Sequence, residues 1–451
     1  MTDSRRELPS VNSLLETAGV RHLLEQHPRK VVLDAVRQTV DAARTSGAGQ
    51  RTEAEWVETI TSNLLESTRP SLSRVINATG LVLHTNLGRA PLADAAIRAI
   101  ERVAQGFSNL EYDVETGTRG SRYSHCVGLL RQLTGAEDAL VVNNCAAAIV
   151  LSLNALAQRK EVLVSRGELV EIGGSFRIPE IMGRSGARLV EVGTTNRTHD
   201  DDYRRAITPK TGAIVKVHRS NFAIEGFTSD VSVERLAFIA SEHGLPIIHD
   251  LGSGLILPLD DYGLSGEPTA ATALASGADL VLMSGDNLLG GPQAGIILGK
   301  ADMVAKLRKN PFARAMRVDK LTLSALEATL RLYLEPATAL REIPVLAMLT
   351  ERLEQLESRG RAIVGTLETD RVSARLVPSV ASVGGGAFPT AQIPSCSVSL
   401  PDSARDWEKR LRHGDPPVIG RISEDTFLLD LRSVFPREDA ALVHAILRAR
   451  A

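Results

Sequence analysis

The stretch DLVLMSGDNLLGGPQAG, residues 279–295, is the strongest indication of fold in this chain. It opens with an apolar run from Leu280 to Met283, which is typical of a strand buried on both faces, and continues into a serine-led, glycine-rich turn. A second stretch, HDLGSG at residues 249–254, has the same plan, since an apolar run leads into Asp250 and a glycine-rich turn follows. Ligands of parallel α/β sheets collect at the carboxyl ends of the strands. The two stretches therefore predict a ligand site at one edge of such a sheet.

Further short β-branched runs alternate with helix-length segments from Ser71 to about Pro336. Strands separated by helices indicate βαβ units, so we expect an α/β domain with a largely parallel sheet at 71–336. Residues 1–70 have apolar side chains at helical spacing and predict a helical N-terminal domain. Residues 337–451 mix helical spacing with short alternating runs and predict a small α+β domain. The expected strands of the large domain are 139–142, 162–164, 189–192, 213–217, 246–249, 280–283 and 294–298.

The composition is that of an ordinary globular protein, with 43% hydrophobic and 24% charged residues among 451. No apolar run reaches the roughly 18 residues that a membrane span needs, and residues 1–9 lack the apolar core of a signal peptide. Three cysteines without CxxC spacing provide neither a disulfide framework nor a zinc site. We therefore expect a cytoplasmic protein without a metal centre. The net charge of −2 gives no sign of nucleic-acid binding, although a local basic patch would suffice for it.

Three segments carry candidate chemistry. Asp250 either caps its turn or holds a ligand, and Ser284 leads the turn of the other strand. Asn144, Cys145 and Ala146 follow the expected strand 139–142 and open a helix, where free backbone N–H groups suit a phosphate. Small residues at this place also suit close packing of helix on sheet, and a cysteine here is more often packed than nucleophilic.

This layout resembles that of pyridoxal-phosphate (PLP) enzymes with the aminotransferase-like fold, fold type I. In such enzymes the aspartate keeps the pyridinium nitrogen protonated and the serine hydroxyl suits the cofactor phosphate. A lysine three residues after the serine forms the Schiff base. The resemblance implies these roles for Asp250 and Ser284, adds Ser253 as a cofactor-binding candidate, and puts Asn287 at the lysine position.

Two other features stay open at this point. The triple glycine 384–386 favours a flexible turn over a phosphate cradle, because no strand-to-helix pattern surrounds it. His218 and Glu168 are placed where a residue could stack on the cofactor ring, and each fits a structural role equally well.

Several motifs in order, over nearly the whole length, resemble the bacterial selenocysteine synthases, the L-seryl-tRNA(Sec) selenium transferases. A set of motifs in the right order is far more specific than any one of them. They are LPSV at 8–11, INATG at 76–80, HTNLGR at 84–89, GTRGSR at 117–122, KVHRSN at 216–221, DLGSG at 250–254, LLGGPQAGI at 288–296, RAMRVDK at 314–320 and PVIGR at 417–421.

The resemblance implies conversion of seryl-tRNA(Sec) to selenocysteinyl-tRNA(Sec), with PLP as cofactor, selenophosphate as selenium donor and a PLP-bound aminoacrylyl intermediate. It assigns the phosphate-bearing donor to Arg89, Arg314 and Arg317, and guanidinium groups suit phosphate oxygens. It also implies that residues 1–70 recognise the tRNA and that the chain forms a homodecamer with active sites at dimer interfaces.

Asn287 departs from the family pattern, because an amide nitrogen can neither form a Schiff base nor move the α-proton. Lys300 and Lys320 are the nearby lysines that could replace it. The chain could be a substituted form of an active enzyme, a silent tRNA-binding homologue, or a protein that binds PLP noncovalently and acts slowly. A PLP lyase acting on a small amino acid or amino sugar is a further alternative, against which the N-terminal helical zone argues.

Overall fold

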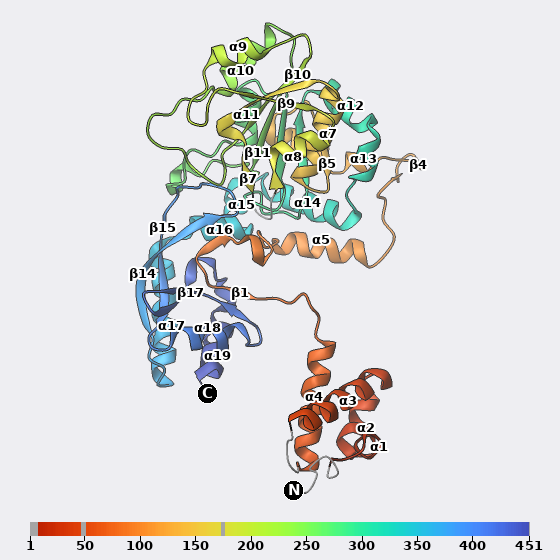
Figure 1. Ribbon diagram of the computed structural model, residues 1–451, viewed down its shortest axis with the longest axis vertical. Coiled ribbons are helices and arrows are strands. Elements are labelled where there is room, and N and C mark those ends of the chain that lie inside the picture. Colours follow the sequence, from red (N-terminus) through yellow and green to blue (C-terminus); the bar gives the residue numbers. More distant parts are fainter. Residues whose placement is uncertain (1–7, 47–50, 173–175, 451) are drawn as a thin grey trace. The chain divides into compact units, whose positions relative to one another are not determined.

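A computed structural model describes residues 8–46, 51–172 and 176–450 (Figure 1). The chain divides into two compact units, Met1–Arg74 and Val75–Ala451. The larger unit has the mixed α/β architecture that the alternating pattern predicts. Within the described residues, no helix is both long enough and apolar enough to cross a bilayer.

The smaller unit is a helical bundle with a hydrophobic core of its own. Apolar residues at helical spacing on α3, among them Val36, pack against Trp56 and Ile60 of α4. A capping box starts α4: the Thr52 hydroxyl accepts from the Glu55 backbone N–H, and the Glu55 carboxylate accepts from the Thr52 N–H at 2.7 Å. The helices are α1 (Val11–Leu15), α2 (Ala18–Gln26), α3 (Arg29–Ser46) and α4 (Glu53–Thr68).

A seven-stranded sheet forms the centre of the larger unit, in the order β5-β13-β12-β11-β10-β6-β9. β13 is antiparallel to both of its neighbours, and the other six strands run in one direction. The strands are β5 (Asp138–Val142), β6 (Glu161–Ser165), β9 (Arg188–Val192), β10 (Thr211–Val217), β11 (Ile247–Gly252), β12 (Leu280–Ser284) and β13 (Gly295–Gly299). All seven strands expected from the sequence are present.

Both faces of this sheet are buried. Alternate residues of each strand enter different cores, as Val281 and Met283 lie on one face of β12 and Leu280 and Leu282 on the other. One core includes side chains of α6 (Val127–Thr134), α9 (Asp200–Ala206), α10 (Val233–Ser241), α11 (Ala270–Ala275), α14 (Lys320–Leu332), α15 (Pro336–Glu342) and α16 (Pro344–Thr350). The other includes side chains of α7 (Cys145–Ala157), α8 (Ile178–Arg184), α12 (Ala301–Lys309) and α13 (Pro311–Ala315).

A second sheet of five strands lies in the C-terminal part, in the order β17-β18-β15-β14-β2 (Figure 1). Its strands are β14 (Arg375–Gly384), β15 (Ile393–Leu400), β17 (Arg421–Ser423), β18 (Thr426–Asp430) and β2 (Leu81–Leu83), and its core includes side chains of α17 (Leu353–Thr369), α18 (Ala404–Arg412) and α19 (Asp439–Arg450).

The start of the larger unit joins this C-terminal sheet. β2 pairs with β14, and β1 (Ile76–Asn77) pairs with β16 (Val418–Ile419). The sequence pattern predicts residues 76–83 as part of the large domain. Their pairing with strands some 300 positions away could not be predicted, because such pairing leaves no local signal. The remaining elements are α5 (Asp94–Ala104) and the short hairpins β3–β4 (Tyr112–Asp113, Thr118–Arg119) and β7–β8 (Glu171–Ile172, Phe176–Arg177).

Candidate active site

The carboxyl ends of β11 and β12 meet the first turn of α7 around a cavity of about 230 Å³. This is the sheet edge at which the two sequence stretches predict a ligand site, and parallel α/β sheets bind ligands there. Its walls are made by Arg89, Asn144, Cys145, Ala146, Ser220, Asp250, Gly252, Ser284, Asp286, Asn287, Gln293, Gly385 and Gly386.

Asp250 is the buried carboxylate of this cavity. Burial raises its pKa to about 6, and a hydrogen bond from the Cys145 thiol to Oδ1, at 3.5 Å, opposes that rise. Burial and the same carboxylate raise the pKa of the Cys145 thiol, so this cysteine stays protonated and is no nucleophile. Among the described residues no basic side chain forms an ion pair with Asp250. A cationic ring nitrogen placed against it would supply the missing charge.

The first turn of α7 provides a site for an anion. Asn144 caps the helix, since its Oδ1 accepts from the Ala147 N–H at 2.8 Å. The backbone N–H groups at the start of this 13-residue helix have no intrahelical partners and carry the positive end of its dipole. Gly295 permits this arrangement, because a Cβ there would lie 2.0 Å from the Asn144 carbonyl oxygen. Ser284, the residue paired with Gly295, faces the same cavity.

Asn287 occupies the cavity wall at the position of the expected lysine. Its side chain is buried, and no described residue donates a hydrogen bond to its Oδ1. Its Nδ2 lies 3.5 Å from the Gly252 carbonyl oxygen, which is a weak contact. An unpaired buried amide oxygen is costly, and a donor from a bound group would satisfy it.

Neither candidate replacement lysine reaches the cavity. Lys300 follows the far end of β13, where its Nζ pairs with Asp279 at 2.5 Å. Lys320 starts α14 and donates to the carbonyl oxygens of Val103 and Gly106. None of the described residues that line the cavity is a lysine.

Arg89 is the arginine that enters the cavity. Its Nη1 lies 3.2 Å from both carboxylate oxygens of Asp286, which follows β12 by two residues. Its backbone is left-handed, with φ of 62°, in the turn after the short helix Thr85–Leu87. The fork of the guanidinium retains further donors toward the cavity.

Three other predicted residues do not line this cavity. Arg317 lies 3.8 Å from Glu111, which also binds Arg122 at 2.8 Å, and Arg314 is exposed on α13. Ser253 is fully buried, and its hydroxyl has no hydrogen-bond partner within residues 8–46, 51–172 and 176–450, but it lies outside the wall. Within one chain, therefore, Arg89 alone of the three predicted arginines lines the cavity.

The triple glycine forms a turn, as the sequence predicts, and this turn also lines the cavity, which the sequence pattern did not indicate. β14 leads directly into it, and Gly385 and Gly386 form part of the cavity wall. All three glycines have left-handed backbones, with φ of 75°, 60° and 81°, and a Cβ on Gly384 would lie 2.7 Å from the Leu83 carbonyl oxygen. The run of three glycines was the signal in the sequence that could have indicated this part of the site. Their position at the cavity depends on β14 of the five-stranded sheet, which leads into them.

Ser220, Asp286 and Gln293 also line the cavity and were not predicted. Ser220 belongs to the motif KVHRSN, Gln293 to LLGGPQAGI, and Asp286 to the stretch 279–295, so the signal that could have found them lay there. The other two open candidates lie elsewhere: the His218 backbone N–H donates to the Asp250 carbonyl oxygen at 2.9 Å, and Glu168 pairs with Lys216 at 2.7 Å.

Comparison with known families gives two matches on this chain. The family described as L-seryl-tRNA selenium transferase matches residues 75–435, and the one described as selenocysteine synthase N terminal matches residues 5–44. Together they cover most of both compact units.

Curated relatives are similar over nearly their whole length. An L-seryl-tRNA(Sec) selenium transferase of Geobacter sulfurreducens is 49% identical over 97% of this chain and 98% of its own length. One of Moorella thermoacetica is 46% identical over 98% and 96%. Among solved structures, a D-glucosaminate-6-phosphate ammonia-lyase aligns with a TM-score of 0.61 at 23% identity, covering 86% of this chain and 97% of its own, which supports the fold.

Proposed function

The chain belongs to the L-seryl-tRNA selenium transferase family, and we propose on this basis that it acts on seryl-tRNA(Sec) in selenocysteine synthesis with PLP as cofactor. Matches to the family over both units, at close to half identity, carry this proposal. Selenophosphate as donor, a homodecamer and a cytoplasmic location belong to the same proposal and rest on the family resemblance. Recognition of the tRNA by the N-terminal helical region is proposed on the match at residues 5–44.

The residues of the 230 Å³ cavity fit PLP held without a covalent bond. The Asp250 carboxylate lacks a cationic partner among the described residues, the start of α7 offers free N–H groups, and Asn287 Oδ1 is an unpaired buried acceptor. The residues do not fit a Schiff base, because no lysine among the described residues lines the wall. When bound there, PLP supplies an electron sink that stabilises negative charge on the α-carbon of an amino acid.

The side chains of the chain itself divide the remaining work. Asp250 would bind a protonated ring nitrogen, and the N–H groups of α7 with the Ser284 hydroxyl would bind the phosphate. Arg89, positioned by Asp286, presents a guanidinium suited to an anionic selenium donor. Arg314 and Arg317 would join it only if a second copy contributed them, which agrees with the proposed oligomer.

Asn287 limits what this site can do. It can donate or accept a hydrogen bond, but it cannot take a proton from the α-carbon at neutral pH or bond covalently to the cofactor. This one residue favours a second candidate function, in which the chain binds seryl-tRNA without completing the transfer. The lyase alternative has less support, because a lyase that acts on small molecules has no need of the N-terminal domain matched at residues 5–44.

The decisive experiment restores the lysine. Wild type and Asn287→Lys are incubated with PLP, reduced with borohydride and mapped by peptide mass spectrometry. We expect a label only in the variant, at position 287, because only there does an amine enter the cavity. Exposed Asn109→Lys, which adds the same charge outside the cavity, is the matched control and should remain unlabelled at position 109.

Conversion of seryl-tRNA(Sec) is then measured with selenophosphate. Since a positioned general base contributes roughly 10²–10⁴-fold to a rate, Asn287→Lys should exceed wild type by about 10²-fold or more. A variant that takes the label but converts nothing would support the silent binder. A variant that fails to bind PLP would refute the cofactor site.

A further inference from the structure

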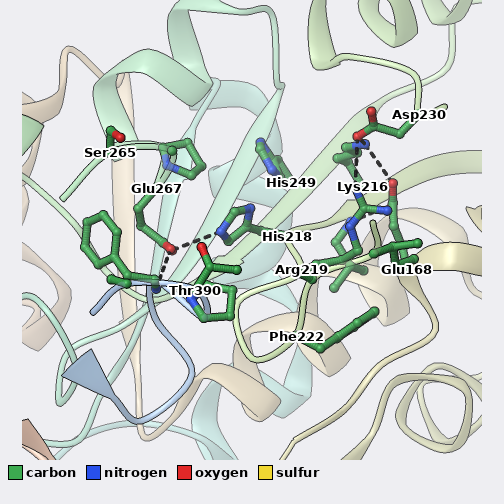
Figure 2. A pocket seen from close by; sticks show the side chains of 18 of the residues that line it. Glu168, Lys216, His218, Arg219, Phe222, Asp230, His249, Ser265, Glu267 and Thr390 are labelled. Atoms are coloured by element: carbon green, nitrogen blue, oxygen red, sulfur yellow. Dashed lines mark hydrogen bonds and ion pairs between the residues drawn. The ribbon is translucent and has the colours of Figure 1, made fainter. Parts of the chain in front are cut away.

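Figure 2 shows a second cavity, of about 710 Å³. Several of its residues are neighbours in the chain of residues that line the 230 Å³ cavity, which we call the cofactor cavity. Three chain segments line both. Residues 216–219 face the second cavity and Ser220 the first, His249 faces the second and Asp250 the first, and the loop after β14 continues from Gly386 at one to Phe388 at the other. A molecule spanning these segments would place one part in each cavity.

One end of the second cavity is a buried carboxylate with an open acceptor. The Glu267 side chain is 1% exposed, and its Oε2 accepts from the Phe388 backbone N–H at 3.1 Å. Its Oε1 lies 3.1 Å from His218 Nε2, an ion-pair distance without the alignment of a hydrogen bond, so among the described residues Oε1 receives no hydrogen bond. Figure 2 shows the two side chains pointing toward one another. A buried acceptor in this condition favours a ligand that brings a donor.

Phe388 reinforces this end. Its φ of 47° is a strained conformation for a bulky residue, and it aims the N–H at Glu267. Strain of this kind concentrates at ligand sites. The carboxylate is therefore held in position by the loop that also forms the wall of the cofactor cavity.

The other end of the cavity is not a strong anion site. Lys216 is paired with Glu168 at 2.7 Å and with Asp230 at 3.5 Å, and Arg219 lies 3.4 Å from Asp230 (Figure 2). Since these cations already have partners, a ligand gains little from a large negative charge. A part of a molecule that has low charge and brings a hydroxyl donor suits the cavity better.

Flat apolar surfaces and a neutral imidazole complete the wall. Phe222, Phe388, Pro268 and Pro389 offer faces on which a planar ring can pack. His249 Nδ1 is buried and has no hydrogen-bond partner in the described part of the chain. Burial lowers the pKa of this histidine to about 3, so the ring is neutral at physiological pH. A neutral imidazole nitrogen can exchange a hydrogen bond with a nucleobase.

These features together describe a nucleoside site. Carboxylates bind ribose hydroxyls in dinucleotide sites, and unstacked bases of RNA pack on aromatic side chains. We propose that this cavity binds the terminal nucleoside of the aminoacylated RNA, with its free ribose hydroxyl donating to Glu267. The inference rests on the proposed function. It also agrees with the presence of two neighbouring cavities. One ribose hydroxyl carries the amino acid, which would enter the cofactor cavity, and the other hydroxyl is free to bind Glu267.

The test compares two RNA ends on the full chain loaded with PLP. Trinucleotide CCA and the same trinucleotide ending in 2′,3′-dideoxyadenosine are titrated by calorimetry into wild type, Glu267→Gln and Asp230→Asn. Wild type should bind CCA roughly tenfold or more tightly than the dideoxy form, because a hydrogen bond to a charged acceptor is lost. Glu267→Gln should abolish most of this ratio. Asp230→Asn, on the opposite wall, should keep it.

Two results would overturn the inference: equal binding of both trinucleotides by wild type, including no measurable binding at millimolar concentration, or an unchanged ratio in Glu267→Gln. Unaltered circular dichroism and PLP absorbance verify that Glu267→Gln is folded. Conversion of seryl-tRNA by Asn287→Lys is measured beside these titrations. If that conversion occurs and the trinucleotide ratio is absent, the nucleoside site is wrong and the proposed function stands. If seryl-tRNA is neither bound nor converted, the proposed function fails.

Discussion

Asp250 and Asn287 are two buried polar residues of one cavity. Among the described residues, Asp250 forms no ion pair and Asn287 Oδ1 has no hydrogen-bond partner. Burial raises the pKa of Asp250 to about 6, because the carboxylate is removed from water without a basic side chain to pair with it. Asn287 leaves its Oδ1 unpaired in the same wall. Buried polar groups in this condition lower the stability of the folded protein, as expected at a site where a bound ligand supplies the missing partners.

The raised pKa of Asp250 predicts the direction in which the stability of the folded protein changes with pH. The unfolded chain titrates this carboxyl near 3.8 and the folded chain near 6, so the folded protein loses stability as pH rises through that window and stays lower above it. A shift of about two units corresponds to roughly 3 kcal/mol. In the absence of PLP, Asp250→Asn should therefore gain stability over wild type between pH 4 and 7, and the gain should level off above pH 7.

Urea unfolding at a series of pH values measures this difference. The exposed Asp261→Asn substitution is the control and should show no comparable trend. Addition of PLP should reduce the stability difference between Asp250→Asn and wild type, because a cationic ring nitrogen stabilises the charged carboxylate of wild type. A gain for Asp250→Asn that is independent of pH would contradict the buried, unpaired carboxylate.

At the scale of elements, the site depends on how closely the turns after β11 and β12 approach. Gly254 ends the HDLGSG turn with φ of 75°, and a Cβ there would lie 2.2 Å from the Ser284 carbonyl oxygen. The Leu288 N–H donates to the Ser253 carbonyl oxygen at 2.9 Å, which ties the two turns together. Gly254 thus permits the close contact between the two turns, and this contact sets the distance between Asp250 and Ser284.

Gly254→Ala should separate these turns. We expect it to cost several kcal/mol of stability, because a backbone oxygen cannot move aside as a flexible side chain can. Gly263→Ala is the matched control, since Gly263 has the same φ of 75° and a Cβ there meets no atom within 4 Å. It should show the backbone strain alone, on the order of 1–2 kcal/mol. Equal losses in thermal unfolding would argue against the close approach.

At the scale of the whole molecule, the chain has two compact units with separate hydrophobic cores. The cofactor cavity and the second cavity are both formed by residues of Val75–Ala451. The match described as selenocysteine synthase N terminal falls in the other unit. Cofactor binding and tRNA recognition are thus expected to reside in different units.

Removal of residues 1–74 tests this division. The shortened chain should retain PLP binding within about twofold, because no residue of the cavity wall is lost, and its affinity for seryl-tRNA(Sec) should fall by at least tenfold. Filter binding and cofactor absorbance measure the two quantities. Retained tRNA affinity would place RNA recognition in the larger unit, and loss of both activities would show that the units depend on one another for folding.

Local patterns in the sequence suffice to predict the strands of the large sheet and the polar residues at their carboxyl ends. Apolar runs, glycine turns and helix starts each involve residues close together in the chain, so they place Asp250, Ser284 and Asn144 at one edge of the sheet. The α/β class follows from the same patterns, the family follows from the resemblance of its motifs, and the comparisons confirm both. The absence of lysine at 287 is likewise a fact of the sequence.

Which distant segments join that edge depends on the tertiary structure. Gly385 and Gly386 arrive through the C-terminal sheet, and Arg89 arrives through a turn held by Asp286, while Arg314 and Ser253 lie outside the cavity wall. The second cavity likewise combines Glu267, His218 and Phe388 from three separate loops. Such contacts depend on strand pairing and packing between residues far apart in the chain, and these leave no periodic or local trace in the sequence.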